Sequence, residues 1–203
     1  MSGPVRLGIF GGSFDPIHFG HLFVANAVAA HAGLERVLFQ PVGDPAHRSA
    51  VAPSEDRRAM VLLAIRDNDR FMLDETALRQ PGPVYTADTM PLLRKAYPDA
   101  SFHFIAGADS LIDTPWRRLD EVVSELHGFI VVSREGADPK RLEPTLSGLP
   151  RELGQRFSFL DLPLVDVSAS AIRARVAARE PIRYLVPDAV ADYIARAHLY
   201  EKG

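Results

Sequence analysis

Two histidines that are three residues apart, His18 and His21, follow a glycine pair near the start of the chain. The stretch from Gly11 to His21 reads Gly-Gly-Ser-Phe-Asp-Pro-Ile-His-Phe-Gly-His, and a short apolar run precedes it. Glycines let a backbone approach a phosphate closely, and the start of a helix attracts an anion through its N–H groups and its dipole. A spacing of three places both imidazoles on one face of the first helical turn, with Gly20 between them. The residues therefore predict a site for a polyphosphate.

Two other interpretations of the histidine pair are open from the residues alone. Nearby histidines can simply pack in a core or lie on the surface, and a metal site would need a third ligand that the neighbouring sequence does not obviously supply. The common phosphate motifs, Gly-x-Gly-x-x-Gly and the Walker pattern ending in Gly-Lys-Ser/Thr, are absent from the sequence. The glycine pair before the histidines and the predicted helix after them favour phosphate binding.

The pattern of apolar residues predicts an α/β protein with a mainly parallel sheet. Short apolar runs predict strands at residues 5–10, 36–41, 71–73, 101–106, 127–132 and 157–160. Apolar residues at helical spacing predict helices at residues 20–31, 86–97, 170–178 and 187–197, a helix capped by Ser54, and a short helical stretch around Leu111 and Trp116. Strands that alternate with helices indicate βαβ units with right-handed crossovers. Residues 134–155 have weak patterning and predict a loop and a short helix.

Four informative segments follow predicted strands of this sheet. They are Gly11–His21, Gly43–Arg48, Gly107–Asp109 and Ser133–Arg134. Ligands of open parallel sheets bind beyond the carboxyl ends of the strands. The sequence therefore predicts that these segments share one ligand cleft.

Composition limits the classes of protein that the chain can belong to. Its 203 residues fit one domain, 1–203, and the lack of cysteine excludes disulfides, zinc thiolate sites and a cysteine nucleophile. A formal net charge of −3 disfavours a broad nucleic-acid surface. No apolar run approaches about 18 residues, and the N-terminal apolar run is too short for a secretory signal. We expect a cytoplasmic protein without a membrane partner.

The stretch from Gly11 to His21 resembles the (T/H)xGH motif of nucleotidyltransferases, and most closely that of the bacterial nicotinate-nucleotide adenylyltransferases. Further segments are similar to this family over nearly the whole chain: Pro83–Thr89, Gly107–Asp109 with Trp116, Val167–Arg173, Tyr184–Pro187 and Tyr193–Ile194. The resemblance implies a Rossmann-like three-layer αβα nucleotidyltransferase fold whose C-terminal helical part, about residues 165–203, packs on the rest. It also implies the reaction of ATP with nicotinate mononucleotide to give deamido-NAD and pyrophosphate, in NAD biosynthesis.

Such a reaction needs positioning and charge stabilisation rather than a general base. The attacking phosphate is already ionised at pH 7, so the protein must align two anions and stabilise the leaving pyrophosphate. The candidate cations and donors are His18, His21, Arg48, Arg134 and Arg173. Of these we expect His18, His21 and Arg173 to be catalytic. Mg²⁺ would enter with ATP, held mainly by its phosphates and by few protein ligands.

The resemblance assigns ATP to one set of residues. They are Gly11, Ser13, Phe14, His18, Gly20, His21, Gly107, Asp109, Arg134, Ser168, Ser170 and Arg173. Gly107 and Asp109 would hold the ribose, while Ser168, Ser170 and Arg173 would form a second phosphate site. The residues alone leave alternatives open, because a serine or an aspartate there can cap a helix and an arginine can be solvated. Ala169 stands where the family pattern has a hydroxyl residue, so we assign it no phosphate contact.

The resemblance assigns nicotinate mononucleotide to a second set of residues. They are Ser13, Phe14, Arg48, Tyr85, Thr86 and Trp116. Trp116 would stack on the nicotinate ring, backbone groups of Tyr85 and Thr86 would meet its carboxylate, and Arg48 would bind the phosphate. Core packing of Trp116 and a solvated loop position for Arg48 are the alternatives.

Two rival functions remain open from the sequence. One is another adenylyltransferase of the same superfamily, for phosphopantetheine, against which the Tyr85–Thr86 and Trp116 segments argue. The other is a nucleotide-binding module that lacks the chemistry, which loss of His18, His21 or Arg173 would indicate; all three are present. A homo-oligomer is possible, and residues 135–156 have no assigned role.

Overall fold

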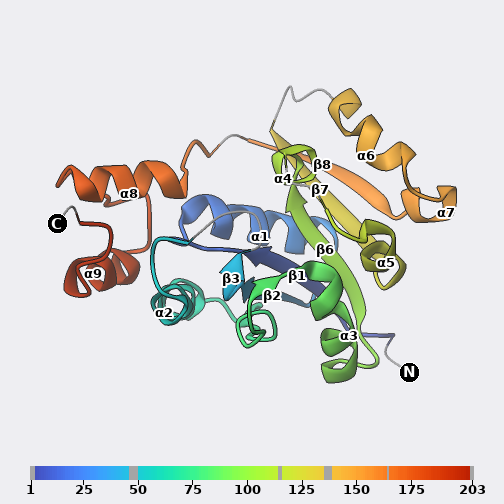
Figure 1. The fold of residues 1–203 in the computed structure, drawn as a ribbon, viewed down its shortest axis with the longest axis horizontal. Coiled ribbons are helices and arrows are strands. Elements are labelled where there is room, and N and C mark those ends of the chain that lie inside the picture. Colours follow the sequence, from blue (N-terminus) through green and yellow to red (C-terminus); the bar gives the residue numbers. More distant parts are fainter. Residues whose placement is uncertain (1–2, 46–49, 114–115, 135–138, 164, 202–203) are drawn as a thin grey trace.

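A six-stranded sheet forms the centre of the computed structural model, which describes residues 3–45, 50–113, 116–134, 139–163 and 165–201. Its strands are β1 (Arg6–Gly12), β2 (Arg36–Pro41), β4 (Phe71–Leu73), β6 (Ser101–Gly107), β7 (Gly128–Arg134) and β8 (Phe157–Leu162). The strand order is β4-β2-β1-β6-β7-β8, and every neighbouring pair is parallel (Figure 1). The predicted parallel sheet and its six strands are confirmed, with ends that shift by one or two residues.

The order of the strands reverses at β1. From β1 the chain runs outward to β2 and β4, then returns to the other side of β1 and continues through β6, β7 and β8. Leu7 and Ile9 of β1 pair with Phe102 and Phe104 of β6. The space beyond the carboxyl ends of two such strands is where doubly wound sheets bind their ligands. In this chain that position belongs to the residues after Gly12 and Gly107.

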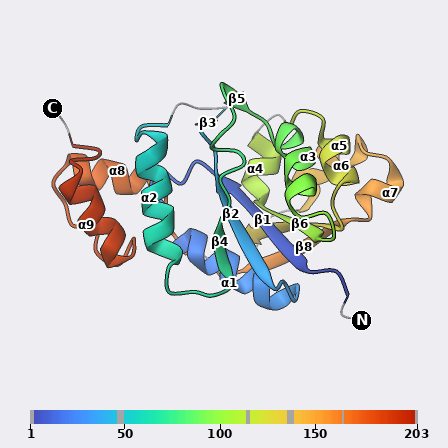
Figure 2. The ribbon, with the colours of Figure 1, turned by 90° about the horizontal axis from the view of Figure 1, so that it is seen from below.

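Helices cover both faces of the sheet and form two separate apolar clusters. The helices are α1 (Phe19–His31), α2 (Ser54–Ile65), α3 (Thr86–Ala96), α4 (Ala108–Asp113), α5 (Leu119–Ser124), η1 (Pro139–Leu142), α6 (Glu143–Ser147), α7 (Arg151–Gly154), α8 (Ala169–Ala177) and α9 (Asp188–Arg196). One cluster joins Val28 of α1 and Met60 of α2 to the sheet. The other joins Met90 of α3 and Val122 of α5 to the opposite face. The three-layer αβα arrangement follows, and Figure 2 shows the helices on either side of the sheet.

Three local expectations were wrong. Pro53, not Ser54, is the N-cap of α2, and Ser54 is its first residue. Helix α4 ends at Asp113, so Trp116 lies outside it. The weakly patterned segment holds η1, α6 and α7 in its described part, rather than one short helix. Two short strands, β3 (Asp44–Pro45) and β5 (Pro83–Val84), also pair in parallel, although their proline- and glycine-rich sequence predicts only loop.

The C-terminal helices lie at one end of the molecule, beside α2 (Figures 1 and 2). Tyr193 of α9 donates a hydrogen bond of 2.7 Å to Asp56 of α2. After α9, the hydroxyl of Tyr200 donates a 2.7 Å hydrogen bond to the Asp15 carboxylate in the first turn. The end of the described chain is therefore tied to the turn that follows β1.

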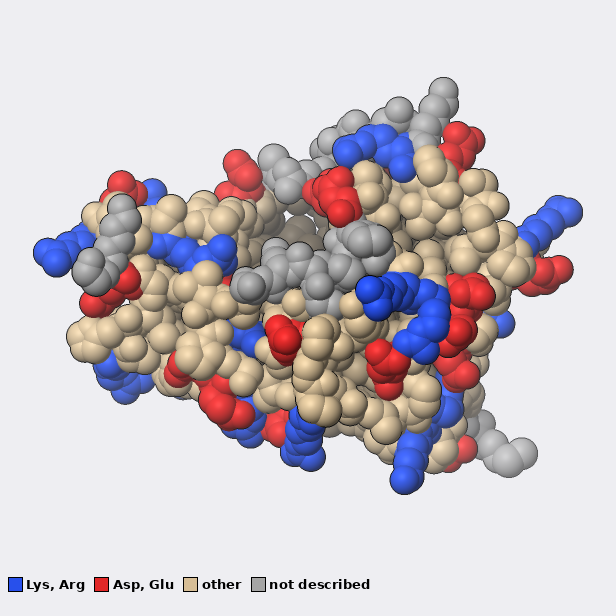
Figure 3. Space-filling view, in the orientation of Figure 1, with Lys and Arg blue, Asp and Glu red and all other residues tan. Residues whose placement is uncertain are grey.

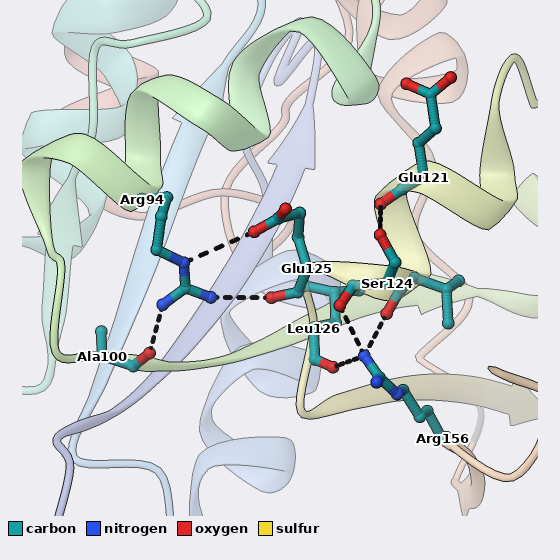
Figure 4. Close-up of polar contacts among 8 residues, drawn as sticks. Arg94, Ala100, Glu121, Ser124, Glu125, Leu126 and Arg156 are labelled. Carbon is teal, nitrogen blue, oxygen red and sulfur yellow. Dashed lines mark hydrogen bonds and ion pairs between the residues drawn. The ribbon is translucent and has the colours of Figure 1, made fainter. Parts of the chain in front are cut away.

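Two arginines bind main-chain carbonyls near the amino ends of β6 and β8, away from the carboxyl ends of the strands (Figure 4). Arg94 of α3 donates to the main-chain carbonyls of Ala100 and Glu125, each at 2.8 Å. Arg156 donates to three carbonyls at the C-terminal end of α5. These contacts satisfy carbonyls that the end of a helix leaves without an internal partner.

Basic and acidic side chains are interspersed over the face drawn in Figure 3. The chain has 23 Lys and Arg against 26 Asp and Glu, so neither sign dominates. Within the described ranges, no helix combines the length and the apolar character that crossing a membrane requires.

Candidate active site

A cavity of about 690 Å³ lies at the carboxyl ends of β1 and β6. The residues that line it include Gly11, Gly12, Ser13, Val42, Pro45, Tyr85, Thr86, Gly107, Asp109 and Trp116. The structure thus brings together four segments far apart in the chain, which follow β1, β2, β5 and β6. The volume of the cavity falls in the range of small-molecule sites. Of the four segments predicted to meet at one cleft, those that begin at Gly11, Gly43 and Gly107 contribute residues to this cavity, the second through Pro45.

The turn after β1 is shaped by the burial of Phe14. Its side chain is 2% exposed, and its backbone has a φ of +46°, in the left-handed region. The ring packs edge-on against Phe10 and His21, with centroids 5.8 and 5.1 Å apart. A Cβ on Gly12 would lie 3.2 Å from this ring. Phe14 can therefore offer a ligand only its backbone, while its ring supports the histidine.

The two predicted histidines are stacked on each other at the start of α1. Their ring centroids are 3.7 Å apart, and the backbone N–H of His18 donates to Nδ1 of His21 at 3.2 Å. Nδ1 of His21 is thus an acceptor, which places the proton of its neutral ring on Nε2. Nδ1 of His18 is buried without a hydrogen-bond partner among the described atoms.

Burial lowers the pKa of His18 to about 4. An imidazolium is penalised where water is excluded and no counter-ion compensates it. At pH 7 the free protein therefore holds His18 as a neutral hydrogen-bond donor rather than as a cation. A bound phosphate would supply the missing negative charge and raise this pKa.

The start of α1 has fewer amides for a ligand than the sequence suggests. The N–H of Phe19 donates to the Leu185 carbonyl at 3.1 Å, and that of His21 donates to the His18 carbonyl at 3.0 Å. Gly20 is required by packing, because a Cβ there would lie 3.0 Å from Nδ1 of His18. The amides of Phe19 and His21 are therefore already paired within the protein.

A second helix start adjoins the histidine pair. A Cβ on Gly20 would lie 3.7 Å from the Val167 carbonyl, just before α8. Ser168 is the N-cap of α8 and accepts from the Ala171 N–H, so the capping alternative is confirmed. The hydroxyls of Ser168 and Ser170 are 3.1 Å apart, and both residues are exposed. The start of α8 therefore lies beside the start of α1, next to Gly20.

Arg173 of α8 contacts the first turn directly. Its Nη1 donates to the Asp15 carbonyl at 2.6 Å. The cavity lining does not include His18, His21, Ser168, Ser170 or Arg173, but Phe10, which lines it, packs edge-on against His21 with ring centroids 6.1 Å apart. The predicted residues therefore form two neighbouring parts, an open cavity and a polar group at the starts of α1 and α8.

The far wall of the cavity carries the aromatic residues. Tyr85 is the N-cap of α3, and Thr86 is its first residue. The Trp116 indole N–H donates to the Ser110 carbonyl at 3.1 Å, and its ring packs edge-on against Phe104 with centroids 5.5 Å apart. Trp116 is partly exposed and lines the cavity. Packing and ligand contact are therefore both open to this one side chain.

Arg57 is a residue that the sequence analysis missed. It is 1% exposed and donates through Nη1 to the carbonyls of Ser13 and Val42, at 2.8 and 2.6 Å. Its Nη2 donates to Gly43 at 2.7 Å and its Nε to Ala52 at 3.1 Å. Arg57 thereby fastens two residues of the cavity wall, Ser13 and Val42, to α2. An arginine in an amphipathic helix gives no sequence signal that distinguishes this role from exposure.

Asp15 is the acidic counterpart of Arg57 beneath the first turn. Its buried carboxylate accepts from the N–H groups of Val51 and Ala52, at 2.7 and 3.2 Å, and from Tyr200. Burial and this hydrogen bond raise the pKa of Tyr200. The turn is thus fixed by buried charged groups on one side and is open to the cavity on the other.

Two predicted arginines are not located by the structure. Arg48 lies outside the described residues, and of Arg134 only the backbone, at the end of β7, is described. Other cavity residues, Gln40, Asp113 and Arg117, were not predicted. Within the described part of the chain, no three His, Cys, Asp or Glu side chains gather as a metal site would require.

The sequence is similar to one protein family and to two proteins of the same name. A family model described as cytidylyltransferase-like matches residues 9–175. A protein of Saccharopolyspora erythraea, named a probable nicotinate-nucleotide adenylyltransferase, is 42% identical over 98% of this chain and 92% of its own length. A protein of Symbiobacterium thermophilum with the same name is also 42% identical, over 98% of this chain and 96% of its own length.

Two solved structures have a fold similar to that of this chain. The Plasmodium falciparum nicotinic acid mononucleotide adenylyltransferase, complexed with NaAD, has a TM-score of 0.76 at 20% identity and covers 96% of this chain and 97% of its own. The same enzyme complexed with APC has a TM-score of 0.73 at 20% identity, with 96% of each chain covered. The predicted Rossmann-like nucleotidyltransferase fold is confirmed by this likeness.

Proposed function

Because the chain belongs to the cytidylyltransferase-like family, and within it to the nicotinate-nucleotide adenylyltransferases, we propose that it transfers the adenylyl group of ATP to nicotinate mononucleotide. The products are deamido-NAD and pyrophosphate, so the reaction is a step of NAD biosynthesis. The observation that carries the proposal is the cavity at the reversal of strand order. Glycines at the ends of two strands line one side of it, and aromatic side chains line the other.

We assign the ATP side to the strand ends and to the polar group beside them. Gly107 and Asp109 would meet the adenosine ribose, because a carboxylate can accept hydrogen bonds from both hydroxyls. A Cβ on Gly107 would meet no atom within 4 Å, so the protein leaves open space there for a ligand. The remaining ATP residues are proposed to be Gly11, Ser13, Phe14, His18, Gly20, His21, Arg134, Ser168, Ser170 and Arg173.

We assign nicotinate mononucleotide to the far wall of the cavity. Trp116 would stack on the pyridine ring, and the backbone of Tyr85 and Thr86 would face its carboxylate. Ser13 and the Phe14 backbone lie between the two substrates. Arg48 is proposed to bind the mononucleotide phosphate.

The proposed chemistry is an in-line displacement at the α-phosphorus of ATP. An oxygen of the mononucleotide phosphate forms the new P–O bond, and the bond from the α-phosphorus to the oxygen bridging the β-phosphorus breaks. The bonding electron pair leaves with that oxygen on pyrophosphate. No proton has to be removed from the nucleophile. His18, His21 and Arg173 therefore act by holding the phosphates and stabilising charge, not as acid–base catalysts.

We propose that Mg²⁺ accompanies ATP. Mg²⁺ prefers oxygen ligands, keeps several waters, and is usually held by substrate phosphates together with one or two carboxylates. Asp109 and Asp113 are the carboxylates among the described residues that line the cavity. When bound, the ion would neutralise part of the triphosphate charge.

ATP and nicotinate mononucleotide are the proposed partners, and both are metabolites of the cytoplasm, where we propose that the protein acts. The test is pyrophosphate release by the purified protein with ATP, Mg²⁺ and one acceptor at a time: nicotinate mononucleotide, nicotinamide mononucleotide or phosphopantetheine. We expect release with nicotinate mononucleotide. Pyrophosphate release only with phosphopantetheine would contradict the proposal. A lack of release with all three acceptors would contradict it as well.

A further inference from the structure

A cation, Arg117, lies on the aromatic side of the cavity. Arg117 lines the cavity next to Trp116, and among the described lining residues it is the only Lys or Arg. Its guanidinium carbon lies 4.4 Å from the centroid of the Tyr85 ring. That distance is within the range of a cation–π contact, which restricts where the guanidinium can go. The Arg117 side chain therefore lies against Tyr85 and beside Trp116, two residues proposed for the acceptor end.

Arg117 has no acidic partner in the described part of the chain, whereas its neighbour does. Arg118 forms ion pairs with Asp88 and Glu121. Two carboxylates, Asp109 and Asp113, line the same cavity as Arg117. Without Arg117, Asp109 and Asp113 would be the only charged side chains of the described lining, and they would repel an anionic ring. A cation without a carboxylate partner at this wall favours a ligand that carries negative charge there.

We propose that the Arg117 guanidinium binds the carboxylate on the pyridine ring of the acceptor and makes the enzyme prefer the acid to the amide. The inference rests on the proposed function and adds a side chain to the backbone groups assigned above. A guanidinium presents paired N–H donors that match both oxygens of a carboxylate. A carboxamide has one acceptor oxygen, no charge, and an NH₂ group that the guanidinium would oppose.

The test compares kcat/KM for nicotinate and nicotinamide mononucleotide in the wild type, Arg117→Gln, Arg117→Lys and Arg118→Gln. Arg117→Gln should lower kcat/KM for the acid by about 10- to 100-fold, mainly through KM, and change that for the amide by less than about 3-fold. Arg117→Lys should recover part of the loss. Arg118→Gln is the matched control, because Arg118 is adjacent but paired elsewhere, and should keep the wild-type ratio.

Equal losses for acid and amide in Arg117→Gln would contradict the inference, since that result indicates a phosphate contact common to both. An unchanged acid-to-amide ratio would contradict it as well. The wild-type rate with nicotinate mononucleotide tests the proposed function separately, so the two failures are distinguishable.

Binding provides a readout that does not depend on turnover. Trp116 is the only tryptophan of the chain and lines the cavity, so its fluorescence should report occupancy. We expect nicotinate mononucleotide to bind Arg117→Gln about 10-fold or more weakly than it binds the wild type. Equal affinity of both proteins for the acid would overturn the assignment.

Discussion

In the free protein His18 is a neutral, buried imidazole, and a bound phosphate could supply a negative charge beside it. Its ring is stacked on His21, its Nδ1 is buried without a partner among the described atoms, and burial lowers its pKa to about 4. A neutral imidazole still donates one hydrogen bond, and an arriving polyphosphate would favour the charged form. Under the proposed function, the ring would therefore carry positive charge at pH 7 mainly when ATP is bound, where it would stabilise the leaving pyrophosphate.

Replacing His18 by alanine should lower kcat by about 100- to 1,000-fold, the usual effect of losing one donor to developing charge. Steady-state kinetics of pyrophosphate release measure it, with circular dichroism to confirm the fold. His31→Ala is the matched control, because His31 is exposed at the other end of the same helix. Wild-type turnover by folded His18→Ala would show that the imidazole has no part in transfer.

The lowered pKa of His18 also predicts how stability depends on pH. The unfolded chain takes up this proton near the ordinary value of 6.5, and the folded chain only at about 4. The unfolded state therefore binds more protons between these values, and stability is lost as the pH falls through this window. Between pH 7.5 and 5 the loss due to His18 should be roughly 2 kcal/mol.

Urea unfolding of the wild type and of His18→Asn at both pH values measures this loss. The variant cannot titrate at this position, so its free energy of unfolding should fall less between pH 7.5 and 5. Parallel changes in the two proteins would mean that His18 titrates normally in the fold.

The family resemblance, together with the glycines at the strand ends, allowed part of the cavity lining to be predicted. Ser13, Gly107 and Trp116 were assigned from the sequence, and all three line it. Arg57 and Arg117 were not, because an arginine in sequence looks the same whether it is solvated, buried on carbonyls or turned to a ligand. Only the packing around each side chain distinguishes these cases.

At the scale of elements, Arg57 links α2 to the loops that form the cavity wall. Its four donor contacts reach the carbonyls of Ser13, Val42, Gly43 and Ala52. A lysine keeps the charge but has a single ammonium group, which cannot reach carbonyls in so many directions. The turn and the wall would then lose their common support.

Arg57→Lys should therefore destabilise the fold by about 2–4 kcal/mol and lower kcat/KM by about 10-fold or more at a temperature where it is folded. Arg156→Lys is the matched control. Arg156 also binds three carbonyls, but it lies at the amino end of β8, away from the cavity (Figure 4). We expect it to lower the melting temperature and to leave kcat/KM near wild type. The same kinetic effect in both variants would indicate general destabilisation only.

Strands were predictable because each is a short apolar run stopped by glycine or polar residues, as at Gly12 and Gly107. Helix ends and the short strands were less so. The pairing of β3 with β5 depends on two loops meeting in space, and their prolines and glycines hide it in sequence. The end of α4 at Asp113 has a local signal that the prediction did not use, because Pro115 follows and a helix usually ends at or before the residue preceding a proline.

At the scale of the whole molecule, the end of the chain supports its beginning. Tyr200 reaches the Asp15 carboxylate, and Arg173 reaches the Asp15 carbonyl, from the C-terminal part. Sequence patterning predicted helices there but not these contacts, which span more than 150 positions. Apolar spacing carries no information on which polar groups will meet across such a distance.

Tyr200→Phe removes one hydroxyl and leaves the Asp15 carboxylate with its two backbone donors. It should destabilise the protein by about 1–2 kcal/mol and lower kcat several-fold by loosening the turn. Thermal unfolding and steady-state kinetics measure both effects. Tyr193→Phe, which loses a hydrogen bond to Asp56 on α2, is the control expected to affect stability alone. A kinetic loss of the same size in Tyr193→Phe would contradict a specific link to the turn.

The most direct test of the proposed reaction follows the adenylyl group itself. The purified protein is incubated with ATP labelled at the α-phosphate, Mg²⁺ and nicotinate mononucleotide, and the labelled products are separated and identified. We predict that the label appears in deamido-NAD, in equal amount to the pyrophosphate released. Label that stays in ATP, or is released as AMP without joining the mononucleotide, would contradict the assignment of this chain as a nicotinate-nucleotide adenylyltransferase.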